Sequence, residues 1–157
     1  MFKGTYQYVL DGKGRLPVPP AFRRGLAAAG ARGVVLTLLD ECLAVYSPAE
    51  WERLEAQLVA LPAFNKAAKG LARLLASRAV DCALDAQGRI LLPPSLRAAA
   101  GLARHATVIG VLNRFEVWEP ERWRAFLEGS ERLLEDAGLG VEWPPSASPR
   151  PQGKPRS

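Results

Sequence analysis

The feature that most constrains this chain is an internal duplication. The motif Asp-x-x-Gly-Arg spans residues 11–15 and recurs over residues 85–89, and each copy leads into two prolines, two further residues and an arginine. The similarity resumes between residues 46–51 and residues 118–123, with two residues lost between the copies. A period this long is too great for a solenoid. The duplication therefore predicts two pseudo-symmetric half-domains.

The composition favours an ordinary globular protein. The chain has 157 residues, of which 48% are hydrophobic and 24% are charged, so it has enough apolar side chains for a core. Its longest apolar run, residues 34–39, is far shorter than a membrane span, and residues 1–4 do not begin a signal peptide. Cys42 and Cys82 are not repeat-equivalent and lack metal-ligand spacing. We expect a cytoplasmic protein with reduced cysteines and without membrane, metal or cofactor.

The expected domain organisation is a first repeat over residues 1–62, a connecting helix over residues 63–80, a second repeat over residues 81–143 and a tail over residues 144–157. The tail consists mainly of proline, serine and basic residues, which cannot bury a core, so we expect it to be disordered. Residues 1–80 carry 11 lysines and arginines against 6 aspartates and glutamates, whereas residues 81–143 carry 7 against 10. Such an asymmetry steers polyanions to the basic side.

Each copy of the motif predicts a tight turn. An aspartate at the first position caps the turn with its carboxylate, and a glycine supplies the left-handed residue that closes it. The residues in these roles are Asp11, Gly14, Asp85 and Gly88. Because residues 7–10 and residues 16–18 flank the first turn, each repeat is expected to open with a β-hairpin whose exit residue is Arg15 or Arg89.

Other sequence patterns predict further helices and strands, and together they indicate an α+β, mainly β, fold class. Proline pairs followed by glycines predict a short helix after each turn, and apolar runs predict strand pairs within residues 34–46 and 107–118. Residues 47–50 form a capping box that begins another helix. The apolar spacing places Phe64 on the apolar face of the connecting helix, and Gly129 is expected to interrupt the last helix.

Catalysis has little support in the sequence. His105, the one histidine of the chain, is expected in a connecting segment at the surface, and no Ser/His/Asp set can be assembled without it. Asp11 and Asp85 are conceivable as a carboxylate pair in a pseudo-symmetric active site. The adjoining glycines favour the turn-capping role instead. An enzyme is therefore the weakest functional hypothesis for this chain.

The arginines that end the motifs are the stronger functional candidates. Arg15 and Arg89 could each pair with the aspartate four residues earlier, which would also orient the guanidinium toward an external partner. Guanidinium suits bidentate recognition of guanine or phosphate. Lys13 is replaced by Gln87 in the second copy, so the first turn is the more cationic one.

The duplicated motifs resemble the MraZ family of bacterial transcriptional regulators, and each repeat resembles a SpoVT-AbrB-type half-barrel. The resemblance covers about residues 1–135. Two features depart from the family pattern, namely Pro17 within an expected strand and the basic tail. The residues that carry the resemblance are Met1–Gly4, Leu10–Arg15, Val18–Pro19, Phe22–Arg23, Asp85–Arg89, Leu96–Arg97 and Asn113–Trp118.

The resemblance implies a pseudo-two-fold, swapped-hairpin barrel with flanking helices, assembly into ring-shaped homo-oligomers, and association with the nucleoid. It also implies binding to short promoter repeats in double-stranded DNA, usually those of the family's own cell-division and cell-wall gene cluster. We expect DNA contacts from Lys13, Arg15 and Arg89. The residues expected to orient them are Asp11, Gly14, Asp85 and Gly88. The alternative hypothesis is a ring-forming scaffold whose DNA binding is incidental.

Overall fold

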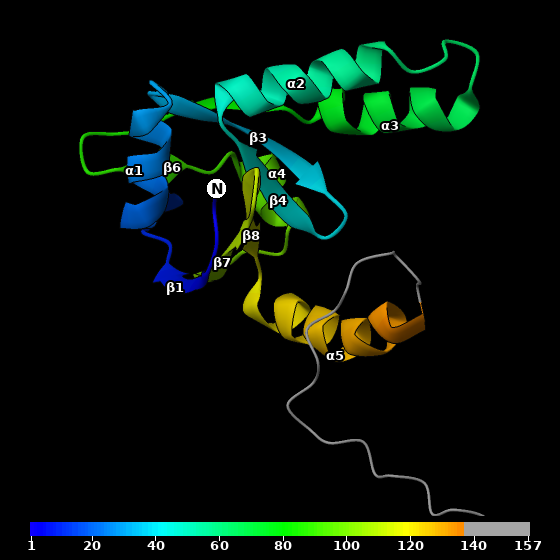
Figure 1. Ribbon diagram of the computed structural model, residues 1–157. Helices are drawn as coiled ribbons and strands as arrows, with labels where there is room; N and C mark the ends of the chain where they lie inside the picture. Colours follow the sequence, from blue (N-terminus) through cyan, green and yellow to red (C-terminus); the bar gives the residue numbers. More distant parts are fainter. Residues whose placement is uncertain (137–157) are drawn as a thin grey trace, which may run out of the picture.

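The apolar runs of the two repeats combine into one antiparallel sheet. The computed structural model describes residues 1–136, which contain a six-stranded sheet in the order β1-β7-β8-β4-β3-β5, a two-stranded sheet of β2 and β6, and five helices (Figure 1). The α+β class expected from the sequence is therefore confirmed. The strands are β1 (Thr5–Val9), β2 (Arg15–Pro17), β3 (Gly33–Leu39), β4 (Cys42–Tyr46), β5 (Val80–Ala83), β6 (Arg89–Leu91), β7 (His105–Val111) and β8 (Arg114–Trp118). The helices are α1 (Pro20–Ala28), α2 (Pro48–Val59), α3 (Lys66–Ser77), α4 (Pro94–Ala99) and α5 (Pro120–Asp136).

The two repeats are interleaved rather than placed side by side. β1 of the first repeat pairs with β7 of the second, and β5 pairs with β3 of the first. The middle of the large sheet is the pairing of β4 with β8, which also joins the two repeats. The strand order is thus symmetric about its centre, because β1, β7 and β8 on one side correspond to β5, β3 and β4 on the other. Neither half could complete its sheet without the other.

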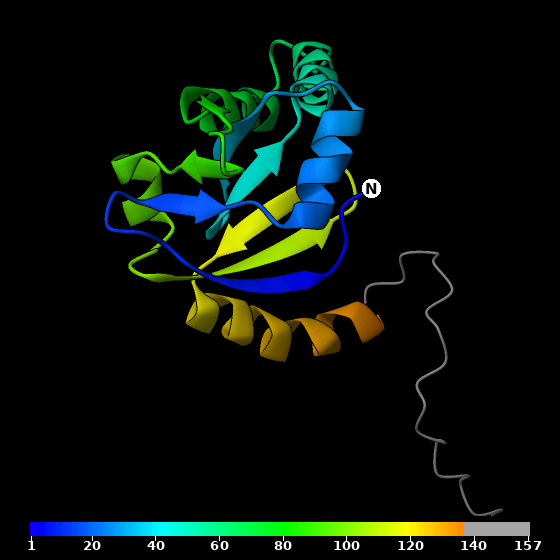
Figure 2. The same ribbon diagram turned by 90° about the vertical axis from the view of Figure 1, so that its left-hand side faces the viewer.

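The period-two alternation of the strands divides the apolar residues between two faces. Val34 and Leu36 of β3 join the main core, whereas the intervening Val35 packs against Trp51 of α2 on the opposite face. α2 and α3 cover this outer face over the first repeat, and α5 packs near β7 on the second (Figures 1 and 2). The main core lies between the inner face of the large sheet and the elements β2, β6, α1 and α4.

The expected β-hairpins at the start of each repeat are wrong. β1 and β2 do not pair with each other, and neither do β5 and β6, because each of these strands pairs with a strand of the other repeat. The tight turns themselves are present. β1 pairs with β7 over five residue pairs. The turn between β1 and β2 has two backbone bonds, from the Asp11 N–H to the Arg15 carbonyl and from the Gly14 N–H to the Asp11 carbonyl. The longer ladder satisfies more backbone groups.

Two expectations about the helices are also wrong. Phe64 precedes α3 and is 95% exposed, because Asn65 caps the helix with its side chain and α3 begins at Lys66. α5 runs through Gly129 and Ser130 without a break, and the Ser130 hydroxyl donates to the carbonyl of Phe126. Ser47 is confirmed as the cap that begins α2, since its hydroxyl oxygen accepts from the Glu50 N–H at 3.2 Å, but the Glu50 carboxylate pairs with Arg53 instead of completing the capping box. The expectations for residues 144–157 lie outside the described part of the chain.

None of the helices within residues 1–136 combines the length and the apolar character that a membrane span requires.

Candidate nucleic-acid interface

The first turn, residues 11–15, is built around one carboxylate. Oδ1 of Asp11 accepts from the backbone N–H groups of Lys13 and Arg15, both at 2.9 Å. Oδ2 accepts from Nε of Arg15 at 2.5 Å. The Gly14 N–H donates to the Asp11 carbonyl at 3.0 Å. One aspartate thus closes the turn and holds the arginine that ends it, as the motif predicts.

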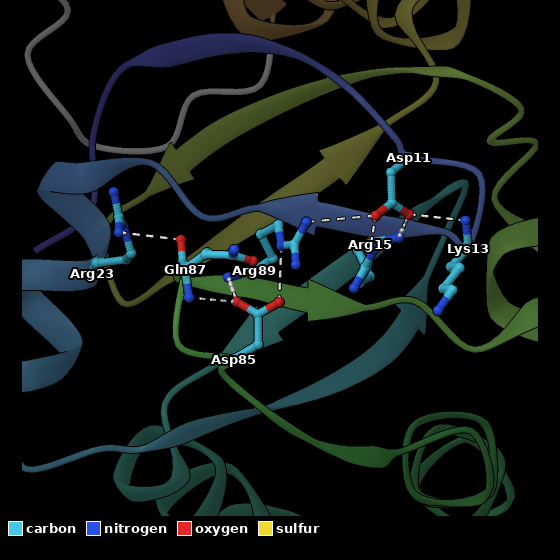
Figure 3. A network of polar contacts seen from close by, with 7 residues as sticks. All are labelled: Asp11, Lys13, Arg15, Arg23, Asp85, Gln87 and Arg89. Carbon is cyan, nitrogen blue, oxygen red and sulfur yellow. Dashed lines mark hydrogen bonds and ion pairs between the residues drawn. The ribbon is translucent and has the colours of Figure 1, made fainter.

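The second turn, residues 85–89, repeats this arrangement bond for bond. Oδ1 of Asp85 accepts from the N–H groups of Gln87 and Arg89 at 2.9 Å, and Oδ2 accepts from Nε of Arg89 at 2.8 Å. The predicted pairing of each arginine with the aspartate four residues earlier is therefore confirmed in both copies (Figure 3). The equivalence follows from the identical spacing of the two motifs.

The two turns are joined by β2 and β6, which form a two-stranded antiparallel sheet that we call the ribbon (Figure 2). At each end of the ribbon, a glycine carbonyl of one turn accepts from the other repeat. The Val18 N–H donates to the Gly88 carbonyl at 2.9 Å, and the Leu92 N–H donates to the Gly14 carbonyl at 3.0 Å. The ribbon therefore places the two turns at its opposite ends. Pro17 fits here because each strand of a two-stranded sheet has an unpaired edge.

The ribbon has one buried and one accessible face. Leu16 and Ile90 are completely buried in the main core, so their neighbours in the pleat point the other way. The side chains of Arg15 and Arg89 are 34% and 25% exposed. The accessible face thus carries both motif arginines, with Leu91, which is 55% exposed, opposite Arg15.

The electrostatics of the turns favour ionised aspartates. The backbone N–H of Arg15, together with the Arg15 side chain and the Lys13 N–H, lowers the pKa of Asp11 to about 2. The backbone N–H of Arg89 is the largest cause of the lowered pKa of Asp85, followed by the Arg89 side chain. Hydrogen bonds to the charged form produce such shifts. Each turn is therefore a stable ion pair at neutral pH.

The motif glycines meet an arginine that the sequence analysis did not assign to the site. Gly14 and Gly88 have φ of 85° and 73°, and both lie under a side chain of the opposite repeat. Arg97 lies over Gly14, and Arg23 lies over Gly88. Their equivalence was visible in the duplication, since each is the arginine that follows the proline pair. The sequence does not show that each arginine reaches the turn of the other repeat, because this contact depends on the interleaved topology.

The arrangement offers binding groups and no catalytic set. Both aspartates are occupied by turn N–H groups and an arginine, which leaves neither free to act as a general base with a raised pKa. His105 is exposed as expected, but it is the first residue of β7 and does not lie in a connecting segment, because its backbone pairs with Val9 of β1. Within residues 1–136, no group of three or more histidines, cysteines, aspartates and glutamates is placed to hold a metal ion. The structure thus brings together Asp11, Arg15, Asp85 and Arg89, with Lys13 at the exposed tip of the first turn.

The fold and the site define a class: a duplicated α+β protein whose repeats share one ribbon and present two aspartate-held arginines. Comparisons with known proteins are more specific. The family model of the MraZ protein matches residues 1–74 and again residues 75–137. The chain is 43% identical to the transcriptional regulator MraZ of Ligilactobacillus salivarius, over 87% of this chain and 93% of the relative. It is 39% identical to the protein of that name from Halothermothrix orenii, over 90% and 97%.

The chain therefore belongs to the MraZ family of transcriptional regulators, with two MraZ repeats. This family is one of regulators and not of enzymes, which agrees with the use of both motif aspartates in holding turns.

Proposed function

We propose that this chain is a sequence-specific DNA-binding regulator of transcription that presents the ribbon to the major groove. The observation that carries the proposal is the pair of guanidiniums of Arg15 and Arg89 on one accessible face, each held through Nε by its aspartate. An arginine held through Nε can direct its terminal nitrogens to an external acceptor, although Nη1 of Arg89 also lies 3.7 Å from Oδ2 of Asp11. A guanine edge offers two acceptors to a guanidinium. The width of the major groove admits a two-stranded β-ribbon.

The roles of the remaining motif residues follow from this geometry. Asp11 and Asp85 orient the arginines, Gly14 and Gly88 allow the turns to close, and Lys13 adds a phosphate contact at the tip of the first turn. The interleaved pairing supports assignment to the swapped-hairpin, AbrB-like barrel class. The proposed division of the chain is a first repeat over residues 1–62, a connecting segment over residues 63–80, a second repeat over residues 81–143 and a basic tail.

One chain presents a small surface, so useful affinity requires several copies on spaced DNA repeats. We infer a ring-shaped homo-oligomer that acts in the cytoplasm at the nucleoid, on promoter repeats of its own cell-division and cell-wall gene cluster. The names of the relatives, which call them transcriptional regulators, support this setting. The inference about the target comes from the family resemblance.

The test uses fluorescence anisotropy with two labelled duplexes. One duplex is the DNA immediately upstream of the gene for this chain, and the other has the same composition in shuffled order. We expect the upstream duplex to bind more tightly by at least tenfold, with the preference retained as the salt concentration rises. Equal binding of both duplexes would contradict sequence-specific regulation and favour the alternative, a scaffold with incidental DNA binding. The observation that supports the scaffold alternative is the set of exposed apolar side chains on α3 and α5, which could form contacts between subunits.

A further inference from the structure

The second turn lacks a cation of its own at the tip, but the structure brings one from the first repeat. Lys13 of the first turn corresponds to the neutral Gln87 of the second. Arg23 of α1 reaches across to this turn, and its Nη1 lies 3.5 Å from the Gln87 carbonyl oxygen. Figure 3 shows Arg23 beyond the Gln87 end of the group and Lys13 beyond the opposite end, with Arg15 and Arg89 between them. Four cationic side chains thus follow the length of the ribbon.

Arg23 is held in this position by close packing rather than by strong hydrogen bonds. A Cβ built on Gly88 would lie 2.2 Å from Cδ of Arg23 and 2.8 Å from its Nε. The side chain therefore occupies the space that the glycine leaves open. Its one contact with a carbonyl is at the limit of a hydrogen bond, and its Nε is buried without an acceptor among residues 1–136.

The repeat-equivalent arginine behaves differently. Arg97 lies over Gly14 in the same way, but its Nε donates to the Leu102 carbonyl at 3.1 Å and its Nη2 donates to the Ala103 carbonyl. Arg97 therefore has a structural role that uses its donors within its own repeat. Within residues 1–136, Nε of Arg23 has no acceptor and Nη1 has only the 3.5 Å contact with the Gln87 carbonyl, although a buried donor without a partner is costly. A purely structural role would explain the packing of Arg23 over Gly88, but it leaves the terminal nitrogens with only the long contact to the Gln87 carbonyl.

We propose that Arg23 contacts a DNA phosphate and supplies the second turn with the cation that Gln87 lacks. The inference rests on the proposed DNA-binding function. A phosphate that reaches the terminal nitrogens beside the ribbon gives them a charged acceptor in place of the long contact with the Gln87 carbonyl, whereas Nε stays buried against Gly88. Gly88 then has a second role, since it admits the Arg23 stem across the turn. A phosphate contact positions the protein on DNA without reading its sequence.

The test compares Arg23→Met, Arg23→Gln and Arg97→Met in the full chain, with the upstream duplex and the shuffled duplex as probes. Arg23→Met keeps an unbranched stem over Gly88, and Arg23→Gln keeps a polar group near the Gln87 carbonyl. We expect both to weaken binding of the two duplexes equally and to reduce the slope of log K against log salt by about 0.9 for each engaged subunit. By the same relation, the loss is about eightfold at 0.1 M salt for one contact. Their thermal melting should match that of the wild type.

Arg97→Met is the matched control, because it removes the equivalent guanidinium from its carbonyl partners. We expect it to lower the melting temperature and to leave the salt slope unchanged. An unchanged slope in either folded Arg23 variant, a loss confined to the upstream duplex, or failure of both variants to fold would overturn the assignment of Arg23. If the wild-type chain binds neither duplex, the proposed function itself fails, which is a separate result.

Discussion

Nη1 of Arg89 lies 3.7 Å from Oδ2 of Asp11, although Arg89 already pairs with Asp85 through Nε at 2.8 Å. The guanidinium of the second repeat thus links the two aspartates. Arg15 has no reciprocal ion pair with Asp85 among residues 1–136. Asp11 therefore faces two guanidiniums and Asp85 faces one, so the two turns differ despite their identical motifs. Asp11 is the residue through which the turns are electrostatically joined.

The stability of the turns should depend on pH in a defined window. The pKa of Asp11 is lowered to about 2 in the folded chain from 3.8, and that of Asp85 is also lowered. A group whose folded pKa is depressed stabilises the fold above its unfolded pKa, and this contribution is lost as the pH falls through the folded value. We expect the melting temperature to fall between about pH 4 and pH 2.

The comparison with Asp11→Asn isolates the contribution of Asp11. The asparagine keeps an oxygen for the turn N–H groups but loses the charge that pairs with Arg15 and Arg89. The difference in melting temperature between the wild type and this variant should be largest near pH 6 and should shrink toward pH 2. A difference that does not change over this range would show that the ion pair contributes nothing to the turn.

Arg15→Ala should abolish sequence-specific DNA binding while the fold is retained. The side chain lies on the accessible face of the ribbon, and the Asp11 carboxylate would still accept from the two turn N–H groups. One bidentate contact to a base discriminates by about 1–3 kcal/mol, and several subunits multiply the loss. Anisotropy with the upstream duplex measures the binding, and circular dichroism checks the fold. Wild-type affinity in the folded variant would remove Arg15 from the interface.

Gly88→Ala should destabilise the chain more than an alanine elsewhere in the motif. The φ of 73° at Gly88 costs a non-glycine residue about 1 kcal/mol or more, and the new Cβ must also displace the Arg23 side chain. Gly12→Ala is the matched control, because a Cβ there meets nothing within 4 Å. We expect a neutral or slightly stabilising effect at Gly12. Urea unfolding measures both, and equal free energies of unfolding would contradict the packing argument.

Local chemistry made the turns predictable, but not the partners of the strands. The spacing of Asp11, Gly14 and Arg15 determines which N–H groups reach the carboxylate, and all of these contacts lie within five residues. The pairing of β1 with β7 joins residues about a hundred positions apart, and no short motif specifies it. The same limit explains why the sequence did not place Arg23 at the second turn, because Gly88, against which it packs, belongs to the other repeat.

The helix boundaries show a different limit of sequence patterns. Apolar spacing placed Phe64 in a helix, but the side chain of Asn65 accepts from the Ala68 N–H and starts α3 after it. Gly129 lowers helix propensity by about 1 kcal/mol relative to alanine, which was too little to break a helix of 17 residues. In both cases a general preference was outweighed by a capping bond or by the rest of the helix.

Lys13→Gln should weaken DNA binding through charge alone. Lys13 is exposed at the tip of the first turn, and only its backbone N–H contributes to the turn. The substitution copies the residue found in the second turn, so the turn should remain closed. We expect the salt slope to fall by about one phosphate contact per engaged subunit. The greater positive charge of the first repeat also predicts that Arg15→Ala reduces binding more than Arg89→Ala does. The opposite ranking would contradict a dominant first repeat.

The chain should assemble into a closed homo-oligomer larger than a dimer. The interleaved repeats already satisfy their two-fold pairing within one chain, so the contact that would make a simple dimer is used internally. Apolar side chains remain exposed at two separate places, near α3 and on α5, which lie on different sides of the molecule (Figure 1). A contact between two different surfaces is head-to-tail, and it closes into a ring when the rotation permits. The most exposed apolar side chains of the two places are Val59, Phe64, Leu71, Leu74, Phe126, Leu127, Leu133 and Leu134.

Light scattering on the full chain and on a chain ending at residue 143 tests the assembly and the role of the tail together. We expect the same mass for the assembly in both, apart from the removed residues, because the tail after residue 143 has only one apolar side chain, Ala147. Phe64→Ser and Leu133→Ser each alter one of the two surfaces, and either should reduce the mass if the contact is head-to-tail. A contact of one surface with itself would be disrupted by only one of the two substitutions. A monomer at micromolar concentration in both the full and the shortened chain would rule the ring out.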